Sequence, residues 1–277
     1  MKRALFVLAI STAVISFGFA NTGVAQDAEW GNLTGQFVVE GKAPENPVEP
    51  AKGSADEAAC LVDGEIPKDD GILVSDKNEL KNVFIYMYLG RGSKDAPTKF
   101  HSQYDAAKDV KLTLDNVKCR FTPKAAFVRT GSTLILKNSD AVGHNCHITL
   151  TSGEEHNISL PANKSVDLKL DAEADDDRFP GKVVCDIHKW MDSILFVRDN
   201  PYVAISGADG KFTMENIPPG TYSFQLWHKK TGFLNMAKLD GYTPDKRRGY
   251  FDVEIKKGEV VDLGVITVPA EALEGDD

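Results

Sequence analysis

The chain has 277 residues, of which 42% are hydrophobic and 26% are charged, and its formal net charge at pH 7 is −9. This acidic excess disfavours nucleic acid as a partner, because phosphates repel an acidic surface and no large basic cluster compensates. The length suits one to three small domains.

The N-terminus has the layout of a secretory signal peptide. Two basic residues precede an apolar run over residues 4–19, and the small residue Ala25 follows. This order predicts a signal peptide over residues 1–25, with cleavage after Ala20 or an uncleaved membrane anchor as alternatives. No later segment has about 18 consecutive apolar residues, so we expect a mature protein that does not span a membrane and resides in the periplasm or cell envelope.

Short runs that alternate apolar and polar residues dominate the rest of the chain, with Gly, Pro, Asn and Asp between them. Runs with this period of two predict β-strands. In chain order we expect strands at residues 33–39, 82–89, 111–114, 126–129, 133–137, 144–150, 165–170, 181–186 and 193–198. The best short helix candidates are residues 54–61 and 98–108, and the chain is predicted to be all-β.

The strand pattern changes near Asn200 and Pro201, where several short strands joined by turns rich in Gly, Pro and Asp begin. Such a series is enough for a small β-sandwich. The sequence therefore predicts a first domain over residues 26–200, a second over 201–269 and an acidic, disordered tail over 270–277.

The chain has four cysteines, which in an exported protein suggest two disulfides. If Cys185 is instead a thiolate ligand of a metal, the other three cysteines allow one bridge. We then favour a pair of Cys60 with Cys119, which leaves Cys146 as a buried free thiol. A bridge between Cys146 and Cys185 is the alternative.

The stretch "CDIHKWM" carries a thiol, an imidazole and a thioether at Cys185, His188 and Met191. Soft sulfur ligands beside imidazole suit copper, and a His, His, Cys plane with a weak axial Met is an electron-transfer copper set. The second imidazole must come from elsewhere. His144 and His147 are the candidates, and their odd spacing on one strand places them on opposite faces.

The sequence "FTPKAAFVRTGSTLILKNSDAVGHN", followed about 40 residues later by C-x-x-H-x-x-M, resembles the plastocyanin and amicyanin group of cupredoxins. The whole chain resembles large exported bacterial proteins labelled methylamine-utilisation or plastocyanin-like proteins. This resemblance implies a cupredoxin Greek-key β-sandwich with one type 1 copper site. The ligands that it implies are His144, Cys185, His188 and Met191. Asn145, which follows the first ligand as in the family, would brace the ligand loop.

The same resemblance implies a carrier of single electrons. An enzyme such as a copper oxidase or nitrite reductase would need further His-rich copper sites, and the six scattered histidines form no H-x-H motif, so we expect no enzyme. The ring edge of His188 would be exposed, and the rim on which a redox partner such as a cytochrome or an oxidase docks would comprise Ile187, Lys189 and Trp190. The alternative from another class is a cell-envelope module that binds polysaccharide or protein and uses the copper domain as a scaffold.

The stretch "GADGKFTMENIPPGTYSFQLWHKKTG", residues 207–232, resembles the carboxypeptidase regulatory-like sandwich. Asp209 and Gly210 suit one turn, and the Pro-Pro-Gly at residues 218–220 suits another. This resemblance implies a second, smaller β-sandwich. We interpret His228, in the same stretch, as a structural residue and not a ligand.

Overall fold

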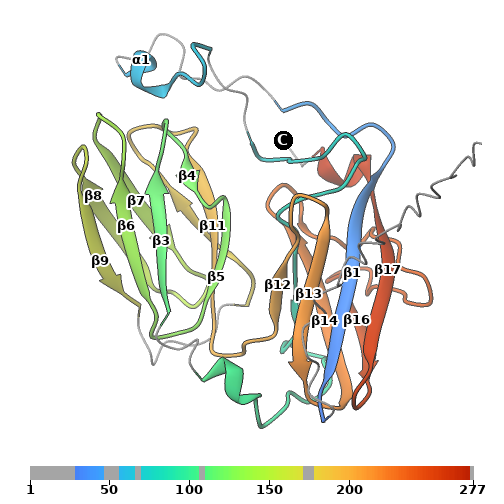
Figure 1. Cartoon of the computed structure of the whole chain (residues 1–277). Helices are drawn as coiled ribbons and strands as arrows, with labels where there is room; N and C mark the ends of the chain where they lie inside the picture. Colours follow the sequence, from blue (N-terminus) through green and yellow to red (C-terminus); the bar gives the residue numbers. More distant parts are fainter. Residues whose placement is uncertain (1–28, 47–55, 66–69, 106–109, 171–177, 275–277) are drawn as a thin grey trace, which may run out of the picture.

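The computed structural model describes residues 29–46, 56–65, 70–105, 110–170 and 178–274. The predicted signal peptide over residues 1–25 lies outside the described residues. The described part is almost entirely β-strand and forms two β-sandwiches side by side (Figure 1). This is the predicted all-β architecture. Among the described helices, none has the length and apolar character needed to cross a membrane.

The first sandwich contains two sheets, with strand orders β4-β3-β6-β9 and β5-β11-β10-β7-β8. Its strands are β3 (Lys111–Asn116), β4 (Phe121–Thr122), β5 (Ala125–Val128), β6 (Thr133–Asn138), β7 (His144–Thr149), β8 (Glu155–Leu160), β9 (Ser165–Lys169), β10 (Gly181–Val184) and β11 (Asp192–Val197).

Alternation along these strands builds the core of the first sandwich. In β6, for example, Leu134 and Leu136 are buried, while Lys137 on the opposite face of the strand is exposed. Successive side chains of a strand point to opposite faces, so one apolar face from each sheet meets the other. The enclosed cluster also contains Cys146, Cys185 and Met191, so part of the predicted site lies within the core.

The second sandwich contains the sheet β13-β1-β17 and the sheet β12-β2-β14-β15, with β16 paired to β14. Its strands are β1 (Gly31–Glu40), β2 (Phe84–Met87), β12 (Val203–Ile205), β13 (Lys211–Ile217), β14 (Gly220–His228), β15 (Gly232–Phe233), β16 (Tyr250–Ile255) and β17 (Val260–Pro269).

The predicted first domain, residues 26–200, is wrong in its N-terminal part. β1 pairs with β13 and β17, and β2 pairs with β12 and β14, so both strands belong to the second sandwich although they lie within residues 26–200. The apolar face of β1, with Leu33, Phe37 and Val39, fills the core of that sandwich. Alternation in the sequence predicts a strand but does not identify its partner, which explains the error.

The predicted acidic tail also needs a correction. Residues Ala270–Leu273 form a short 3-10 helix (η3), and Leu273 is buried in the core of the second sandwich. Its apolar contacts hold this part of the chain to the fold, and residues 275–277 lie outside the described ranges. The two helix candidates correspond to one-turn elements, α1 (Glu57–Cys60) and the 3-10 helix η1 (Ser102–Tyr104).

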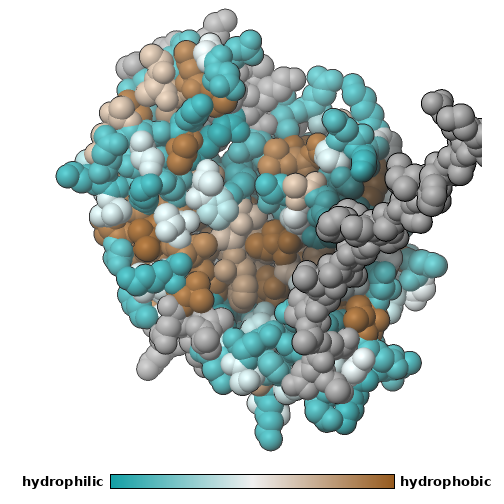
Figure 2. Space-filling view, in the orientation of Figure 1, coloured by the Kyte–Doolittle hydropathy of each residue, from teal (hydrophilic) through white to brown (hydrophobic). Residues whose placement is uncertain are grey.

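The two sandwiches pack against each other through one sheet of each, the sheet that contains β11 and the sheet that contains β2 and β14. The cluster between them contains Phe84 and Tyr86 of β2, Ile194 and Phe196 of β11, and Trp227 of β14. Strands β2, β11 and β14 are therefore buried on both faces, as their nearly continuous buried patterns show. Apolar side chains also gather along the seam between the sandwiches in Figure 2, where polar side chains cover most of the surrounding surface.

Candidate metal centre

The predicted ligands meet where two neighbouring strands end. Cys185 directly follows β10, and His144 is the first residue of its antiparallel neighbour β7. The chain then turns back in a short loop. The N–H of Met191 donates to the carbonyl of His188 at 2.8 Å, and the N–H of Cys185 donates to the carbonyl of Met191 at 3.1 Å. This tight loop places His188 beside Cys185.

Three donor atoms converge in this loop. The Nδ1 atoms of His144 and His188 lie 2.9 Å apart, and each lies 3.9 Å from the Sγ atom of Cys185. All three residues are buried, at 1%, 2% and 1% exposure. They form a group whose donor atoms are close enough to bind one metal ion.

The donor set fits a copper ion by distance and by chemistry. With metal–ligand bonds of about 2.0 Å to nitrogen and about 2.3 Å to sulfur, donors around one ion lie about 3.3 to 3.7 Å apart. The observed separations of 2.9 and 3.9 Å differ from this range by less than about half an ångström. Two imidazoles and one thiolate are the equatorial donors of blue-copper sites.

Met191 lies at the other end of the same loop. It is buried in the core of the first sandwich and bonds to Cys185 and His188 through its main chain. These main-chain bonds keep Met191 in the same loop as Cys185 and His188, and the axial role that the sequence resemblance implies stays a prediction.

Asn145 ties the ligand loop to β7. Its Oδ1 atom accepts a hydrogen bond from the N–H of Asp186 at 2.8 Å and lies 3.3 Å from the Sγ atom of Cys185. Its Nδ2 group donates to the carboxylate of Asp186 and to Asn157, both at 2.8 Å. The Asn145 side chain thus holds the main chain beside Cys185 in place, as expected for a residue that braces the loop.

A buried carboxylate orients the first imidazole. The Oδ2 atom of Asp140 lies 2.8 Å from Nε2 of His144, on the side of the ring away from Cys185. Lys118 and Cys119 both have positive φ, at 51° and 54°, and their N–H groups donate to Asp140. Such a turn presents successive N–H groups to an anion. Asp140 is therefore fixed from two sides and keeps Nδ1 of His144 directed toward Cys185.

A second carboxylate covers the other imidazole. The Oδ2 atom of Asp56 lies 3.0 Å from Nε2 of His188. Asp56 immediately precedes α1, and the structure contains a disulfide between Cys60 of that helix and Cys119. In Figure 1, α1 lies over the end of the first sandwich that carries the site. The disulfide thus attaches this covering segment to the turn that holds Asp140.

This cover corrects one expectation. The family resemblance implies an exposed ring edge for His188, but the residue is only 2% exposed because the segment at Asp56 lies over it. The predicted docking rim is partly at the surface: Ile187 is 58% exposed, Lys189 is exposed and Trp190 is half-buried. The ring of Trp190 packs against His188 with centroids 5.1 Å apart. The docking role of these three residues stays a prediction.

The electrostatics of the buried group favour a thiolate. Burial lowers the pKa of His144, but the hydrogen bonds to Asp140 and Cys185 outweigh it and raise the pKa to about 9. Burial raises the pKa of Cys185, but the hydrogen bonds from His144 and from main-chain N–H groups outweigh burial and lower it. A deprotonated sulfur is the form that binds metal.

Two other residues of β7 with possible donor atoms, His147 and Cys146, do not belong to this group. His147 lies on the other face of the strand and bonds to Glu155 at 2.9 Å and to Asp186 at 3.3 Å. Cys146 is a buried free thiol whose pKa is raised to about 12 by burial. The structure thus places His144, and not His147, beside Cys185 and His188, and leaves Cys146 as a protonated core residue at neutral pH.

Sequence reasoning missed the three aspartates that support the ligands. Asp140 belongs to the N-S-D stretch four residues before His144, so a local signal for it existed. Asp186 sits between two candidate ligands, but its bonds to Asn145 and Asn157 depend on the β7–β8 pairing. Asp56 lies 132 residues before His188 in the chain, and no local pattern points to it.

No protein-family model matches the sequence, and no curated protein matches it. Among solved structures, a Cu-containing nitrite reductase from Thermus scotoductus SA-01 is 18% identical over 32% of this chain and 22% of that chain, with a TM-score of 0.28. A mutant of amicyanin in its reduced Cu(I) form is 19% identical over 32% of this chain and 84% of that chain, with a TM-score of 0.27.

A purple cupredoxin from Nitrosopumilus maritimus is 19% identical over 32% of this chain and 99% of that chain, with a TM-score of 0.25. The chain thus spans about a fifth of the nitrite reductase and most of the two smaller proteins. At these identities and TM-scores the similarity assigns no function, so any function for this chain must rest on the geometry of the three donors.

Proposed function

We propose that this chain is an exported type 1 copper protein that carries single electrons between redox partners and catalyses no reaction of its own. The observation that carries the proposal is the buried convergence of two imidazole Nδ1 atoms and one cysteine sulfur. Copper bound by such donors cycles between Cu(I) and Cu(II), which is the chemistry of an electron carrier.

The protein's own residues hold the three donor side chains in fixed, buried positions. Asp140 and Asp56 each take the outer nitrogen of one imidazole, which directs both Nδ1 atoms toward Cys185. Asn145 and Asp186 bond to each other and hold the main chain that follows Cys185. Because these groups are fixed by hydrogen bonds before a metal binds, a change of one electron requires little rearrangement of the site.

The proposed partner is a redox protein such as a cytochrome or an oxidase in the periplasm or cell envelope. Since the segment at Asp56 covers His188, the exposed residues on either side of His188 in the ligand loop are Ile187 and Lys189. We infer that the partner approaches over this part of the loop. The proposed location follows from the predicted signal peptide.

Repeated reduction and oxidation of the copper-loaded protein tests this function. The expected result is a reversible one-electron change over many cycles, with one copper ion retained per chain in both states. Retention in both states separates an electron carrier from a protein that delivers copper. Release of copper on reduction, or failure to reoxidise, would overturn the proposed role even if copper binds at the predicted residues.

A further inference from the structure

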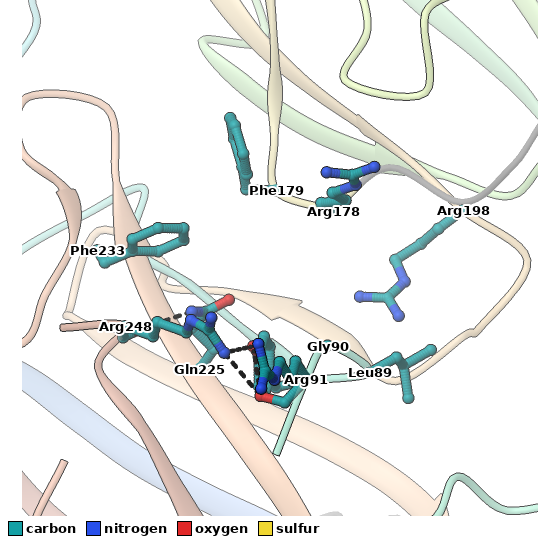
Figure 3. Close-up of a pocket in the computed structure, with 10 residues that line it drawn as sticks. Leu89, Gly90, Arg91, Arg178, Phe179, Arg198, Gln225, Phe233 and Arg248 are labelled. Carbon is teal, nitrogen blue, oxygen red and sulfur yellow. Dashed lines mark hydrogen bonds between the residues drawn. The ribbon is translucent and has the colours of Figure 1, made fainter. Parts of the chain in front are cut away.

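A cavity of about 510 Å³ opens at the seam between the two sandwiches, and residues from both sandwiches line it. Figure 3 shows these side chains surrounding an open space. The residues that dominate the lining are Arg91, Arg178, Arg198, Arg248, Phe179 and Phe233. The cavity lies at the opposite ends of β10 and β11 from the metal-ligand loop, so it is separate from the proposed copper site.

The charge of this cavity contrasts with that of the chain. Of the described residues, four arginines and no acidic residue line it, although the chain has 41 acidic and 32 basic residues. Within the same described ranges, no carboxylate lies within ion-pair distance of Arg91, Arg178 or Arg248. A concave surface lined by charges of one sign focuses the electrostatic potential and attracts counter-ions. The cavity is therefore a favourable place for an anion.

Two of the guanidinium groups are held in position by the protein. Arg248 donates from Nη1 to the hydroxyl of Tyr88 at 3.1 Å and to the carbonyl of Arg91 at 2.7 Å. Arg198 donates from Nη1 to the carbonyl of Met87 at 3.1 Å, and its guanidinium lies over the ring of Phe196 at 5.3 Å. Guanidinium groups fixed in this way lose little further freedom when they bind an anion.

Two phenylalanines form an apolar part of the cavity lining. Phe179, which precedes β10, and Phe233 of β15 pack edge to face with ring centroids 5.7 Å apart. Phe179 is 38% exposed and Leu89, on another side of the cavity, is 39% exposed. Exposed apolar side chains beside fixed cations provide a surface for the hydrocarbon part of a ligand.

We propose that this cavity binds a small organic acid whose carboxylates pair with the arginines and whose planar apolar body lies against Phe179 and Phe233. Guanidinium groups match carboxylates by paired N–H···O hydrogen bonds. The cavity volume of about 510 Å³ lies within the range of about 300–1,000 Å³ that is typical of small-molecule sites. Because each sandwich contributes both an arginine and a phenylalanine, a bound acid would also join the two sandwiches.

Calorimetric titration of the mature protein with phthalate tests the proposal. The matched ligands are dimethyl phthalate, which keeps the ring without the charges, and inorganic phosphate, which keeps the charge without the ring. We expect saturable binding of one phthalate per chain, and binding at least about tenfold weaker for each of the other two, which corresponds to about 1.4 kcal/mol. The dissociation constant for phthalate should be the same with and without copper.

Substitutions assign the binding to the cavity. Arg178→Gln and Arg248→Gln should each weaken phthalate binding at least about tenfold, as expected for the loss of one charged hydrogen-bonding partner. Arg247→Gln is the matched control, because Arg247 is exposed, adjacent to Arg248 in sequence and outside the lining. Thermal unfolding shows whether each variant keeps the fold.

Three results would overturn the proposal. The first is the absence of saturable phthalate binding to the wild-type protein. The second is an equal loss of affinity in Arg247→Gln and Arg248→Gln, which would indicate non-specific charge attraction. The third is binding of dimethyl phthalate or inorganic phosphate as tight as that of phthalate, which would exclude an organic acid as the ligand class.

Discussion

The two sandwiches bury histidine in contrasting ways. In the first, His144 and His188 face each other and Cys185, and a carboxylate contacts the outer nitrogen of each ring. In the second, His228 ends β14 and is 1% exposed, with no carboxylate bonded to it among the described residues. Burial, followed by the charges of Lys229 and Lys230, lowers its pKa to about 4.

The contrast shows how the two candidate ligand histidines differ from a structural one. A buried imidazole without a counter-charge stays neutral and serves only packing and a local hydrogen bond, here from the N–H of Lys230 at 3.3 Å. His144 and His188 each face a carboxylate on the outer nitrogen and a sulfur donor on the inner one. Such an arrangement is the pattern expected for imidazoles that bind a metal. Substitutions at the candidate metal centre and in the second sandwich test this difference between the buried histidines.

The largest expected effect is that of Cys185→Ser. We expect loss of the intense visible absorption from thiolate-to-copper charge transfer, because serine cannot supply the sulfur donor. Absorption spectra of the Cu(II)-loaded proteins check this result. His228→Asn is the control and should keep the wild-type spectrum. A spectrum that survives Cys185→Ser would exclude Cys185 as a ligand.

Removal of the disulfide should have the second-largest effect. The bridge between Cys60 and Cys119 spans 59 positions and has no counterpart in the second sandwich within the described residues. The double variant Cys60→Ser/Cys119→Ser should lower the free energy of unfolding by about 2 to 5 kcal/mol. Denaturant unfolding measures it, and the wild type under reducing conditions should show the same loss. Unfolding at an unchanged midpoint would contradict a stabilising role for the bridge.

Loss of the carboxylate behind His144 should weaken metal binding without abolishing it. Asp140→Asn keeps the size of the side chain but removes its charge. We expect a roughly 10- to 100-fold lower affinity for Cu(II), the usual range for a partner that orients a ligand histidine. Competition with a chelator of known affinity measures the change. Asp252→Asn, in β16 of the second sandwich, should leave the affinity unchanged.

The smallest expected effect concerns the histidine of the second sandwich. The pKa of His228 falls from about 6.5 in the unfolded chain to about 4 in the fold, so the unfolded chain takes up the proton first as the pH falls. Its stabilising contribution is complete above about pH 6.5 and is lost toward about pH 4. Between about pH 7 and 5.5 the loss should be about 1 kcal/mol.

Denaturant unfolding of the wild type and of His228→Asn at several pH values isolates this contribution, because other titrating groups affect both proteins equally. The variant should lose less stability than the wild type as the pH falls. Parallel pH profiles of the two proteins would show that His228 titrates normally in the fold.

The sequence supported the local features of the fold better than the long-range ones. The alternation of Leu134 and Leu136 was enough to predict β6, and the C-x-x-H-x-x-M spacing was enough to place three candidate ligands in one short stretch of the chain. The pairing of β1 and β2 with strands more than 100 residues later was not predicted, because alternation encodes the two faces of a strand and not its neighbour.

The same limit applied to the candidate site. Cys185 and His188 are three residues apart, so their proximity could be predicted from the sequence. Asp56 contacts His188 from a segment 132 residues earlier, which the disulfide of Cys60 with Cys119 attaches to the first sandwich. The expectation of an exposed ring edge failed for this reason, since a covering segment leaves no signal in the ligand loop.

X-ray absorption spectroscopy at the copper edge tests the central claim most directly, because it reports the atoms bound to the metal. For the protein loaded with one equivalent of copper, the geometry of His144, Cys185 and His188 predicts two copper–nitrogen bonds and one short copper–sulfur bond. The sulfur signal should disappear in Cys185→Ser. A first coordination shell made only of nitrogen and oxygen atoms in the wild-type protein would contradict the proposed copper site.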